Sequence, residues 1–282
     1  MANTRFQYVK KFETHDTILL NCYFVIRVDG RGFTEFCDLH NFEKPNDLNA
    51  LKLMNKVAKE VMISFTDIII AYGESDEYSF GFSKSAKVYN RRKEKILSSV
   101  VSCFSSAYVF HWLKYFPKTV LKKVPVFDGR IVLYPDIKNF KDYFAWRQAD
   151  THINNLYNTT FWCLVKSGLT KEKAHERLKG SESKDKNEIL FTEFKINYND
   201  LPEIYKKGTI LIRISGKGNN KKEKAKEEVN TEVKEEDKDN TKDNIVEVEE
   251  KESEPKKQLI KVHESLFAKE FWVKYNLETK LN

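Results

Sequence analysis

Several features that define whole classes of protein are scarce or missing in this 282-residue chain. No apolar run approaches the roughly 18 residues expected of a transmembrane helix. The opening stretch, MANTRFQYVKKFETHD, contains acidic residues and lacks the apolar core of a secretory signal or a transit peptide. We therefore expect no membrane partner and a cytoplasmic protein, with the nucleus as a further compartment.

Cysteine is also scarce, and its spacing excludes a common kind of metal site. The chain has four cysteines, Cys22, Cys37, Cys103 and Cys163, and no two of them form a CxxC pair. This pattern is typical of free thiols in a reducing compartment. A structural zinc site, which usually needs paired thiols or histidines, is not expected.

Charge is abundant but unevenly distributed. The net charge is +7, yet residues 217–257 contain 11 lysines, 14 acidic residues and no aromatic residue. Such a segment has too little apolar surface to form a core, so we predict a disordered charged insertion there. The remainder carries the whole positive excess, and a basic folded body favours an anionic partner such as nucleic acid.

Apolar periodicity predicts an α+β fold with strands and helices in the order β-α-β-β-α-β. This is the ferredoxin-like arrangement of a polymerase-type palm, here followed by additional C-terminal helices. The predicted elements are a strand at 24–28, a helix that begins after 45–47 and reaches 65, a strand–turn–strand unit at 68–82, a helix at 84–115, a strand pair at 126–127 and 131–134, helices at 140–166, 171–178 and 186–194, and a strand at 209–214.

These elements divide the chain into four parts. We predict a palm-like catalytic domain at 1–135 and a helical region at 136–216 that completes the catalytic body. The charged insertion at 217–257 follows, and a C-terminal segment at 258–282, with renewed apolar character, packs back on the body.

Three acidic residues meet at one edge of the predicted sheet. In this topology the first strand lies antiparallel to the third, so Asp29, at the end of the first strand, adjoins the turn that carries Asp76 and Glu77. Clustered carboxylates repel one another unless a cation neutralises them. Carboxylate oxygens suit Mg²⁺, and two such ions can serve phosphoryl transfer. The alternatives are a solvated acidic turn and, for Asp29, a local cap.

Phosphate-binding groups are predicted beside these carboxylates. The loop Gly30-Arg31-Gly32-Phe33-Thr34 is rich in glycine, so its backbone N–H groups can approach a triphosphate, although it matches neither GxGxxG nor a Walker A loop. Lys44, Arg91, Arg92 and Lys95 are candidate phosphate ligands, and the last two share a predicted helix face. A solvated basic face is the alternative reading.

A second polar cluster lies on the predicted helix at 140–166. Its segment 146–158 combines aromatic, amide and basic side chains, including Arg147, His152 and Asn155. Such a helix can read bases or hold phosphates. The alternative is an internal network of satisfied polar groups.

At these residues the chain resembles the tRNA(His) guanylyltransferase family. The resemblance extends over about residues 1–215, in order and at matching spacing. The segments that carry it are RVDGRGF (27–33), FEKPND (42–47), AYGESDEYSF (71–80), FDGR (127–130), WRQADTHINNLYNTTFW (146–162), KNEILF (186–191) and INYN (196–199).

The resemblance implies a palm that extends RNA at its 5′ end. Members of the family add one guanosine to tRNA(His): ATP adenylylates the 5′-phosphate, the 3′-hydroxyl of GTP displaces AMP, and pyrophosphate is removed. Two Mg²⁺ ions serve this chemistry, and family members assemble as dimers of dimers. We therefore expect ATP and GTP as substrates, tRNA(His) as the partner and a homotetramer.

The resemblance also implies roles for individual residues. The implied metal ligands are Asp29, the Gly30 carbonyl and Asp76, and Glu77 joins the two carboxylates as a catalytic residue. The implied nucleotide-binding residues are Asp29, Gly30, Arg31, Gly32, Phe33, Thr34, Lys44, Ser75, Asp76, Arg92 and Lys95. The residues implied in tRNA handling are Arg147, His152 and Asn155.

The sequence departs from the family pattern at Thr34, where the family usually has histidine, and in the insertion at 217–257. Three other functions stay open on the sequence. A template-dependent 3′–5′ polymerase that repairs tRNA 5′ ends would accept many truncated tRNAs. A non-catalytic tRNA-binding module would not need Asp29 and Asp76. A nucleotide cyclase would not need the helix around 146–162.

Overall fold

The structure is a computed structural model that describes residues 4–14, 16–214 and 258–282. The body considered below is formed by Met1–Arg213 together with Leu259–Asn282. The predicted charged insertion at 217–257 lies outside the described residues. Whether it is disordered, and where the four predicted parts of the chain begin and end, therefore stays a prediction.

The centre of the body is a six-stranded sheet in the order β4-β1-β3-β2-β5-β6. The strands are β1 (Tyr23–Gly30), β2 (Ile68–Glu74), β3 (Glu77–Phe82), β4 (Phe127–Tyr134), β5 (Thr209–Ile214) and β6 (Gln258–Val262). β1 is antiparallel to both β3 and β4, so the first four strands reproduce the ferredoxin-like order. The α+β prediction is confirmed.

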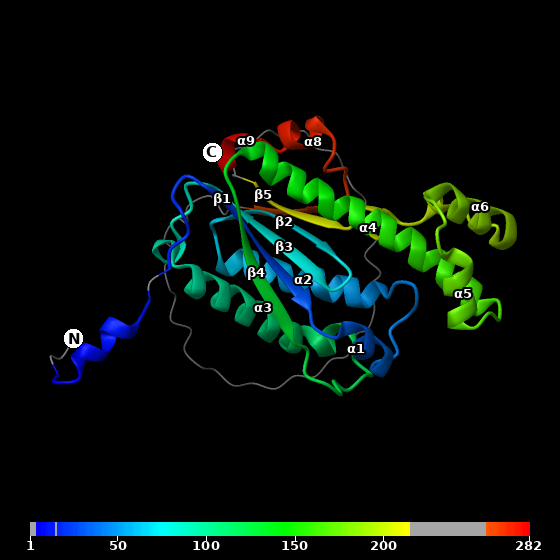
Figure 1. The fold of residues 1–282 in the computed structure, drawn as a ribbon, viewed down its shortest axis with the longest axis horizontal. Helices are drawn as coiled ribbons and strands as arrows, with labels where there is room; N and C mark the ends of the chain where they lie inside the picture. Colours follow the sequence, from blue (N-terminus) through cyan, green and yellow to red (C-terminus); the bar gives the residue numbers. More distant parts are fainter. Residues whose placement is uncertain (1–3, 15, 215–257) are drawn as a thin grey trace, which may run out of the picture. The chain divides into compact units, whose positions relative to one another are not determined.

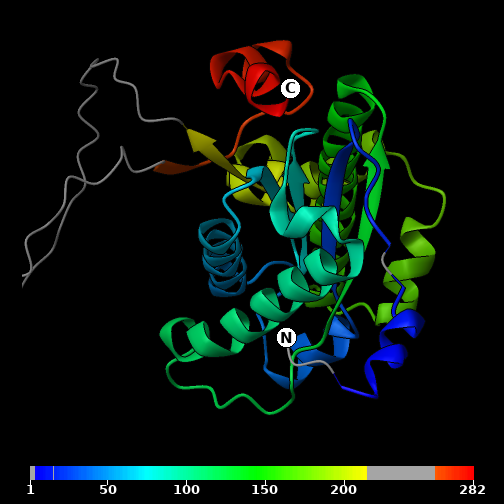
Figure 2. The ribbon, with the colours of Figure 1, turned by 90° about the vertical axis from the view of Figure 1, so that its left-hand side faces the viewer.

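Helices cover both faces of this sheet. α2 (Leu48–Ser64) and α3 (Lys93–Tyr115) lie on one face, and α4 (Ile137–Lys166) crosses the other, as Figures 1 and 2 show. The smaller helices are α1 (Phe33–Leu39), α5 (Lys171–Leu178), α6 (Ser183–Phe194), α7 (Glu203–Lys207), α8 (Lys269–Lys274) and α9 (Leu277–Leu281), with 3₁₀ turns η1 (Gln7–Phe12), η2 (Val88–Arg91) and η3 (Tyr198–Asp200).

Strand β3 has apolar or hydrogen-bonded side chains on both faces of the sheet, so both faces are covered by helices. Every residue of β3 is buried. Tyr78 and Phe80 pack into the core formed with α2 and α3, whereas the Ser79 hydroxyl hydrogen-bonds Tyr143 of α4 at 2.7 Å. A central strand that is buried on both faces holds the hairpin turn before it in a fixed position.

Several predicted element boundaries differ from the structure, and the largest difference is at the start of α3. The helix predicted from residue 84 begins only at Lys93, because Tyr89, Asn90 and Arg91 all have positive φ angles (47°, 53° and 59°), which a right-handed helix cannot include. The buried Arg91 guanidinium stabilises this bend by donating to carbonyl groups, including that of Ile18 at 3.1 Å.

The predicted strand pair around residue 129 is a single strand. β4 is paired with β1 along its whole length. Gly129 is required by packing rather than by a turn, since a Cβ at this position would lie 2.4 Å from Val101 of α3. The sequence prediction also omitted β6 and the helices α1, α7, α8 and α9.

Helix α3 is long and apolar enough, by length and composition alone, to cross a membrane, although we expected no such segment. Core helices satisfy the same criterion. One side of α3 is buried against the sheet and α2, through Ile96, Val100, Phe104, Tyr108 and Trp112.

Candidate active site

The carboxylates predicted to converge do so at one end of the sheet. Asp29 stands opposite Glu77 in the β1–β3 ladder, and the Gly30 N–H donates to the Asp76 carbonyl at 3.1 Å. Ser75 and Asp76 form the two-residue turn between β2 and β3, with Ser75 at a φ of 46°. The topology thus brings together residues that lie far apart in the chain.

Burial and like charge make this end of the sheet suitable for a cation. Burial raises the pKa of Asp76, and the nearby charge of Asp29 raises it further. A bound cation would relieve both effects. Gly30 leaves the necessary space, because a Cβ there would lie 2.4 Å from Phe33 and 2.6 Å from Asp76 Oδ2.

The donor set at this end fits Mg²⁺. Two carboxylates and the Gly30 carbonyl are hard oxygen ligands, and Mg²⁺ normally completes its shell with water and substrate phosphates. No group of three or more His, Cys, Asp and Glu side chains that could hold a metal occurs among the described residues. That finding agrees with a site that relies on phosphate oxygens as well as on Asp29 and Asp76.

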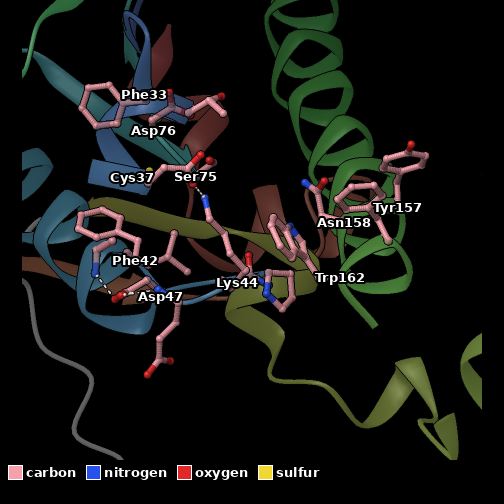
Figure 3. A pocket seen from close by; sticks show the side chains of 18 of the residues that line it. Phe33, Cys37, Phe42, Lys44, Asp47, Ser75, Asp76, Tyr157, Asn158 and Trp162 are labelled. Carbon is pink, nitrogen blue, oxygen red and sulfur yellow. Dashed lines mark hydrogen bonds and ion pairs between the residues drawn. The ribbon is translucent and has the colours of Figure 1, made fainter. Parts of the chain in front are cut away.

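A cavity of about 450 Å³ opens beside these residues (Figure 3). The predicted nucleotide-binding residues Phe33, Thr34, Lys44, Ser75 and Asp76 line it. Its inner wall is largely apolar. The other lining residues used below are Cys37, Phe42, Met54 and Tyr108 on the inner wall and Tyr157, Asn158, Trp162, Lys171 and His175 on α4 and α5.

The rest of the predicted phosphate loop leads from the carboxylates to this cavity. Gly32 has a φ of 67°, which glycine adopts without strain, and it precedes the first residue of α1. The Arg31 N–H donates to the Val126 carbonyl at 2.8 Å, and the Arg31 side chain is exposed. Thr34, in the first turn of α1, lines the cavity and is also exposed.

Arg92 and Lys95 lie away from this cavity. The backbone of Arg92 forms an isolated antiparallel β-bridge with Thr17. The neighbouring Arg91 side chain donates to the Cys22 carbonyl, just before β1. The eight residues of β1 separate that point from the carboxylates, which corresponds to roughly 25 Å. Arg92 and Lys95 line a different surface cavity with Phe12 and Asp16.

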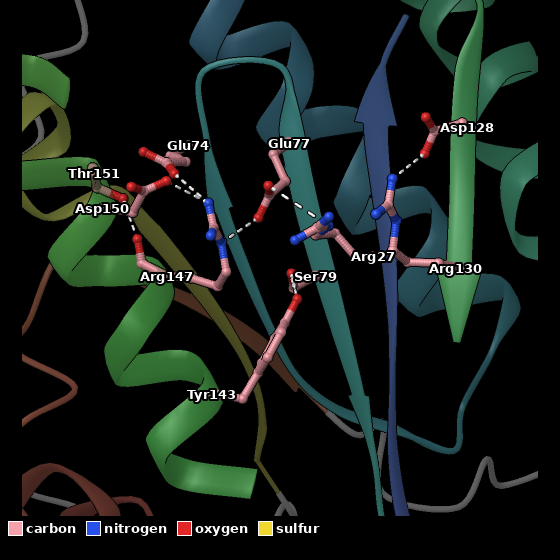
Figure 4. Close-up of polar contacts among 10 residues, drawn as sticks. All are labelled: Arg27, Glu74, Glu77, Ser79, Asp128, Arg130, Tyr143, Arg147, Asp150 and Thr151. Carbon is pink, nitrogen blue, oxygen red and sulfur yellow. Dashed lines mark hydrogen bonds and ion pairs between the residues drawn. The ribbon is translucent and has the colours of Figure 1, made fainter. Parts of the chain in front are cut away.

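Arg147 is an internal residue that connects α4 to the β2–β3 hairpin (Figure 4). Its guanidinium donates to Glu77 at 2.7 Å, to Asp150 at 2.7 Å and to Glu74 at 3.3 Å. Only 7% of the Arg147 side chain is exposed. Burial raises the pKa of Glu74 to about 7 and also raises the pKa of Glu77, while Arg147 opposes both shifts.

Asn155 and His152 take part in a second polar network. Asn155 is buried, accepts from Asn46 at 2.8 Å and donates to the Tyr198 hydroxyl at 2.9 Å. His152 is more exposed, and its Nδ1 lies 3.4 Å from the same hydroxyl. Burial lowers the pKa of His152, and the nearby Lys206 ammonium lowers it further. Of the predicted tRNA-handling residues, Arg147 and Asn155 are therefore internal.

Sequence reasoning missed the aromatic side of the cavity. Tyr157 belongs to the segment 146–158 that we noted as aromatic, and Trp162 only to the longer motif that carries the family resemblance. Lys171 and His175 belong to α5, which carried no functional signal. These residues meet only because α5 turns back beside the C-terminal part of α4. The buried side chains between the two helices are Phe161, Leu164, Ala174 and Leu178.

Comparison with known proteins gives matches over most of the chain. A family model described as tRNAHis guanylyltransferase matches residues 6–135, and one described as the Thg1 C terminal domain matches residues 138–267. The chain is 58% identical over 214 residues to a tRNA(His) guanylyltransferase of Schizosaccharomyces pombe, covering 76% of this chain and 82% of that protein. It is 55% identical over 213 residues to a probable tRNA(His) guanylyltransferase of Mus musculus, covering 75% and 72%.

Solved structures also match this chain. The crystal structure of tRNA(His) guanylyltransferase from Saccharomyces cerevisiae superimposes with a TM-score of 0.71 at 51% identity, covering 74% of this chain and 93% of that one. A bacterial Thg1-like protein in complex with ATP gives a TM-score of 0.61 at 24% identity, covering 73% and 85%. This second match shows a shared fold.

Proposed function

This chain belongs to the tRNA(His) guanylyltransferase family and is a nucleotidyltransferase, and we propose that it adds a single guanosine to the 5′ end of tRNA(His). The observation that carries the proposal is the convergence of Asp29, Gly30 and Asp76 beside a cavity of about 450 Å³. The match to relatives that bear this enzyme's name supplies the substrate.

The proposed reaction has three steps. An oxygen of the RNA 5′-phosphate attacks the α-phosphorus of ATP, and pyrophosphate leaves, so that the RNA end is adenylylated. The 3′-hydroxyl of GTP then attacks the RNA 5′-phosphorus, loses its proton, and displaces AMP. Water finally removes pyrophosphate from the new 5′-triphosphate, which leaves a 5′-monophosphorylated guanosine.

Asp29, the Gly30 carbonyl and Asp76 are the groups that we propose to hold two Mg²⁺ ions. When bound, these ions would neutralise charge on the reacting phosphates. The chain's own contribution is to fix the carboxylates: the ladder positions Asp29, and the hairpin turn positions Asp76. Glu77 accepts from Arg147 and thereby ties the turn to α4.

The cavity can hold nucleotide against these carboxylates. Lys44 extends from its wall, and its ammonium lies 2.9 Å from Asp38. Ser75 and Thr34 offer hydroxyl groups, and Phe33 closes the floor beside Asp76. We propose that ATP and GTP use the inner part of this cavity in the successive steps, with their triphosphates directed towards Asp76.

In one chain, Arg92 and Lys95 lie at the end of β1 that is far from the carboxylates. They could therefore contact such a triphosphate only from a second copy of the chain. We therefore propose a homo-oligomer, a dimer of dimers, in which this basic pair completes a neighbour's site. Co-expressing an Asp76→Asn chain with an Arg92→Ala/Lys95→Ala chain should restore activity that neither variant has alone. Equal inactivity of the co-expressed heteromer would contradict this arrangement.

Nucleotide addition tests the proposed function directly. Purified protein, Mg²⁺, ATP and labelled GTP are mixed with 5′-monophosphorylated tRNA(His), with tRNA(Phe) as the control RNA and the Asp29→Asn variant as the control protein. We expect label in tRNA(His) alone, with ATP required and none from the variant. Label only in shortened tRNAs of any kind would instead identify a repair polymerase.

A further inference from the structure

The outer part of the active-site cavity has a wall, formed by Trp162 and Lys171, that the chemistry above does not use, and Lys44, which we placed beside the nucleotide, also approaches it. Trp162 of α4 lies across the cavity from Ser75 and Asp76 (Figure 3). Two ammonium groups lie over its ring: Lys171 Nζ is 5.5 Å from the ring centroid and Lys44 Nζ is 5.8 Å from it. Both lie on flexible side chains that can turn from the ring to a phosphate. We call Trp162, Lys171 and Lys44 the indole wall.

This wall is held in place by the packing of α4 against α5. The Tyr157 hydroxyl hydrogen-bonds His175 Nδ1 at 2.6 Å, and the His175 ring lies 4.5 Å from the Phe161 ring. Beneath them α4 and α5 share a small apolar core that includes Leu164 and Leu178. Trp162 packs against this core and its ring lies 5.4 Å from the Phe161 ring, so the α4–α5 packing sets the position of the indole.

An indole face flanked by ammonium groups suits one chemical class of ligand. A nucleobase stacks on the ring, and its phosphate lies near the lysines; this combination is typical of sites for unpaired nucleic acid. Stacking needs no base-specific hydrogen bond. The indole wall is therefore suited to hold an unpaired nucleotide whatever its base.

Resting on the proposed function, we propose that the indole wall binds the 5′-terminal nucleotide of the RNA acceptor end after it has separated from its base-pairing partner. The reaction brings an RNA end and a nucleoside triphosphate into one cavity. We place the nucleoside triphosphate against the inner wall, which Phe42, Met54 and Tyr108 line. The RNA chain has to continue out into solvent, and the exposed Lys171 lies on the outer side.

Three variants and one matched control test this assignment. Trp162→Ala removes the stacking face, Trp162→Phe retains a smaller one, and Lys171→Ala removes one phosphate contact. Lys173→Ala is the control, since Lys173 is exposed on the same helix but does not line the cavity. The probe is tRNA(His) with 2-aminopurine as its 5′-terminal nucleotide, titrated without ATP or GTP.

We expect 2-aminopurine fluorescence to be quenched by the wild-type protein, because the probe stacks on Trp162. Trp162→Ala should abolish the quenching and raise the Kd for RNA roughly 5- to 150-fold, the range for loss of one base–aromatic stack. Trp162→Phe should recover most of the affinity. Lys171→Ala should reduce the salt dependence of log Kd by about one unit, and Lys173→Ala should change it less.

Steady-state kinetics separate RNA from nucleotide. If the assignment is correct, Trp162→Ala raises KM for tRNA and leaves KM for ATP and GTP within about twofold, as expected for stacking that only the RNA end uses. A rise in KM for either nucleotide with unchanged RNA binding would overturn it. Lys171→Ala keeps the test valid if Trp162→Ala unfolds, because Lys171 is exposed.

Failure of this inference differs from failure of the proposed function. If the wild type quenches the probe but adds no guanosine, the function is wrong and the indole wall still binds RNA. If Trp162→Ala and Lys171→Ala add guanosine with wild-type KM for tRNA and unaltered fluorescence, the function stands and the indole wall has no role in RNA binding.

Discussion

Replacing Arg147 with methionine should destabilise the fold severely, because its guanidinium compensates several buried carboxylates at once. The Glu74 and Glu77 side chains are only 11% and 12% exposed, and Arg147 lies between them and Asp150. Methionine has a similar length and no charge. The substitution therefore leaves Glu74 buried without a cation, and it leaves Glu77 with only the more distant Arg27 guanidinium, at 3.8 Å.

The expected loss of unfolding free energy is about 3–5 kcal/mol, the usual cost of removing one partner of a buried ion pair. For a body of this size each kcal/mol lowers the melting temperature by about 2–4 °C, so we expect a decrease of roughly 10 °C. The assay is urea and thermal unfolding of the wild type and Arg147→Met. Arg147→Lys is the matched variant, and it should rescue only part of the loss because one ammonium cannot replace the guanidinium fork.

A compensated variant decides whether charge is the cause. Glu74→Gln and Glu77→Gln combined with Arg147→Met remove the uncompensated charge and should recover most of the lost stability. If Arg147→Met alone cost less than about 1 kcal/mol and mainly weakened RNA binding, Arg147 would be a phosphate ligand. The argument from its burial would then be refuted.

The other predictions concern the carboxylates, the close approach at Gly30 and His152. Asp29→Asn and Asp76→Asn should each lower turnover by about 1000-fold or more through loss of a metal ligand without lowering the melting temperature, and near-normal turnover of either variant would place the metal site elsewhere. Gly30→Ala should cost about 1–3 kcal/mol by overpacking, since its Cβ would lie 2.4 Å from Phe33; unchanged urea unfolding would contradict this. The pKa of His152 should lie below 6.5 by NMR. The unfolded state then binds more protons, so His152 lowers the stability of the fold as pH falls through 6.5. Lys206→Met should raise the pKa of His152, and an unchanged pKa would exclude the Lys206 ammonium as a cause.

Topology made the metal-binding end predictable from sequence. The β-α-β-β-α-β order already places the end of the first strand beside the turn of the hairpin, so Asp29 and Asp76 converge before any side chain is positioned. The structure confirms that geometry in the register of β1 and β3. The roles of the residues at this end stay predictions.

The placement of Arg92 and Lys95 depended on features that periodicity does not encode. We expected one continuous helix from residue 84, which would have put the two side chains on one helix face. Three consecutive positive φ angles, at the last three residues of η2, bend the chain instead, and α3 begins only at Lys93. Such a bend is stabilised by contacts with distant carbonyl groups, and local sequence gives no signal for those contacts.

The sequence could not assign a role to the polar side chains of α4. A helix that contacts RNA and a helix that forms an internal network of polar groups can have the same composition. Burial distinguishes them. Arg147 secures the turn that carries Asp76, and Asn155 secures Asn46 just before α2. Trp162, near the C-terminal end of the same helix, lines the cavity. α4 therefore sets the distance between the carboxylates and the indole wall, so a change at Arg147 or Asn155 should alter RNA binding indirectly, through the position of Trp162.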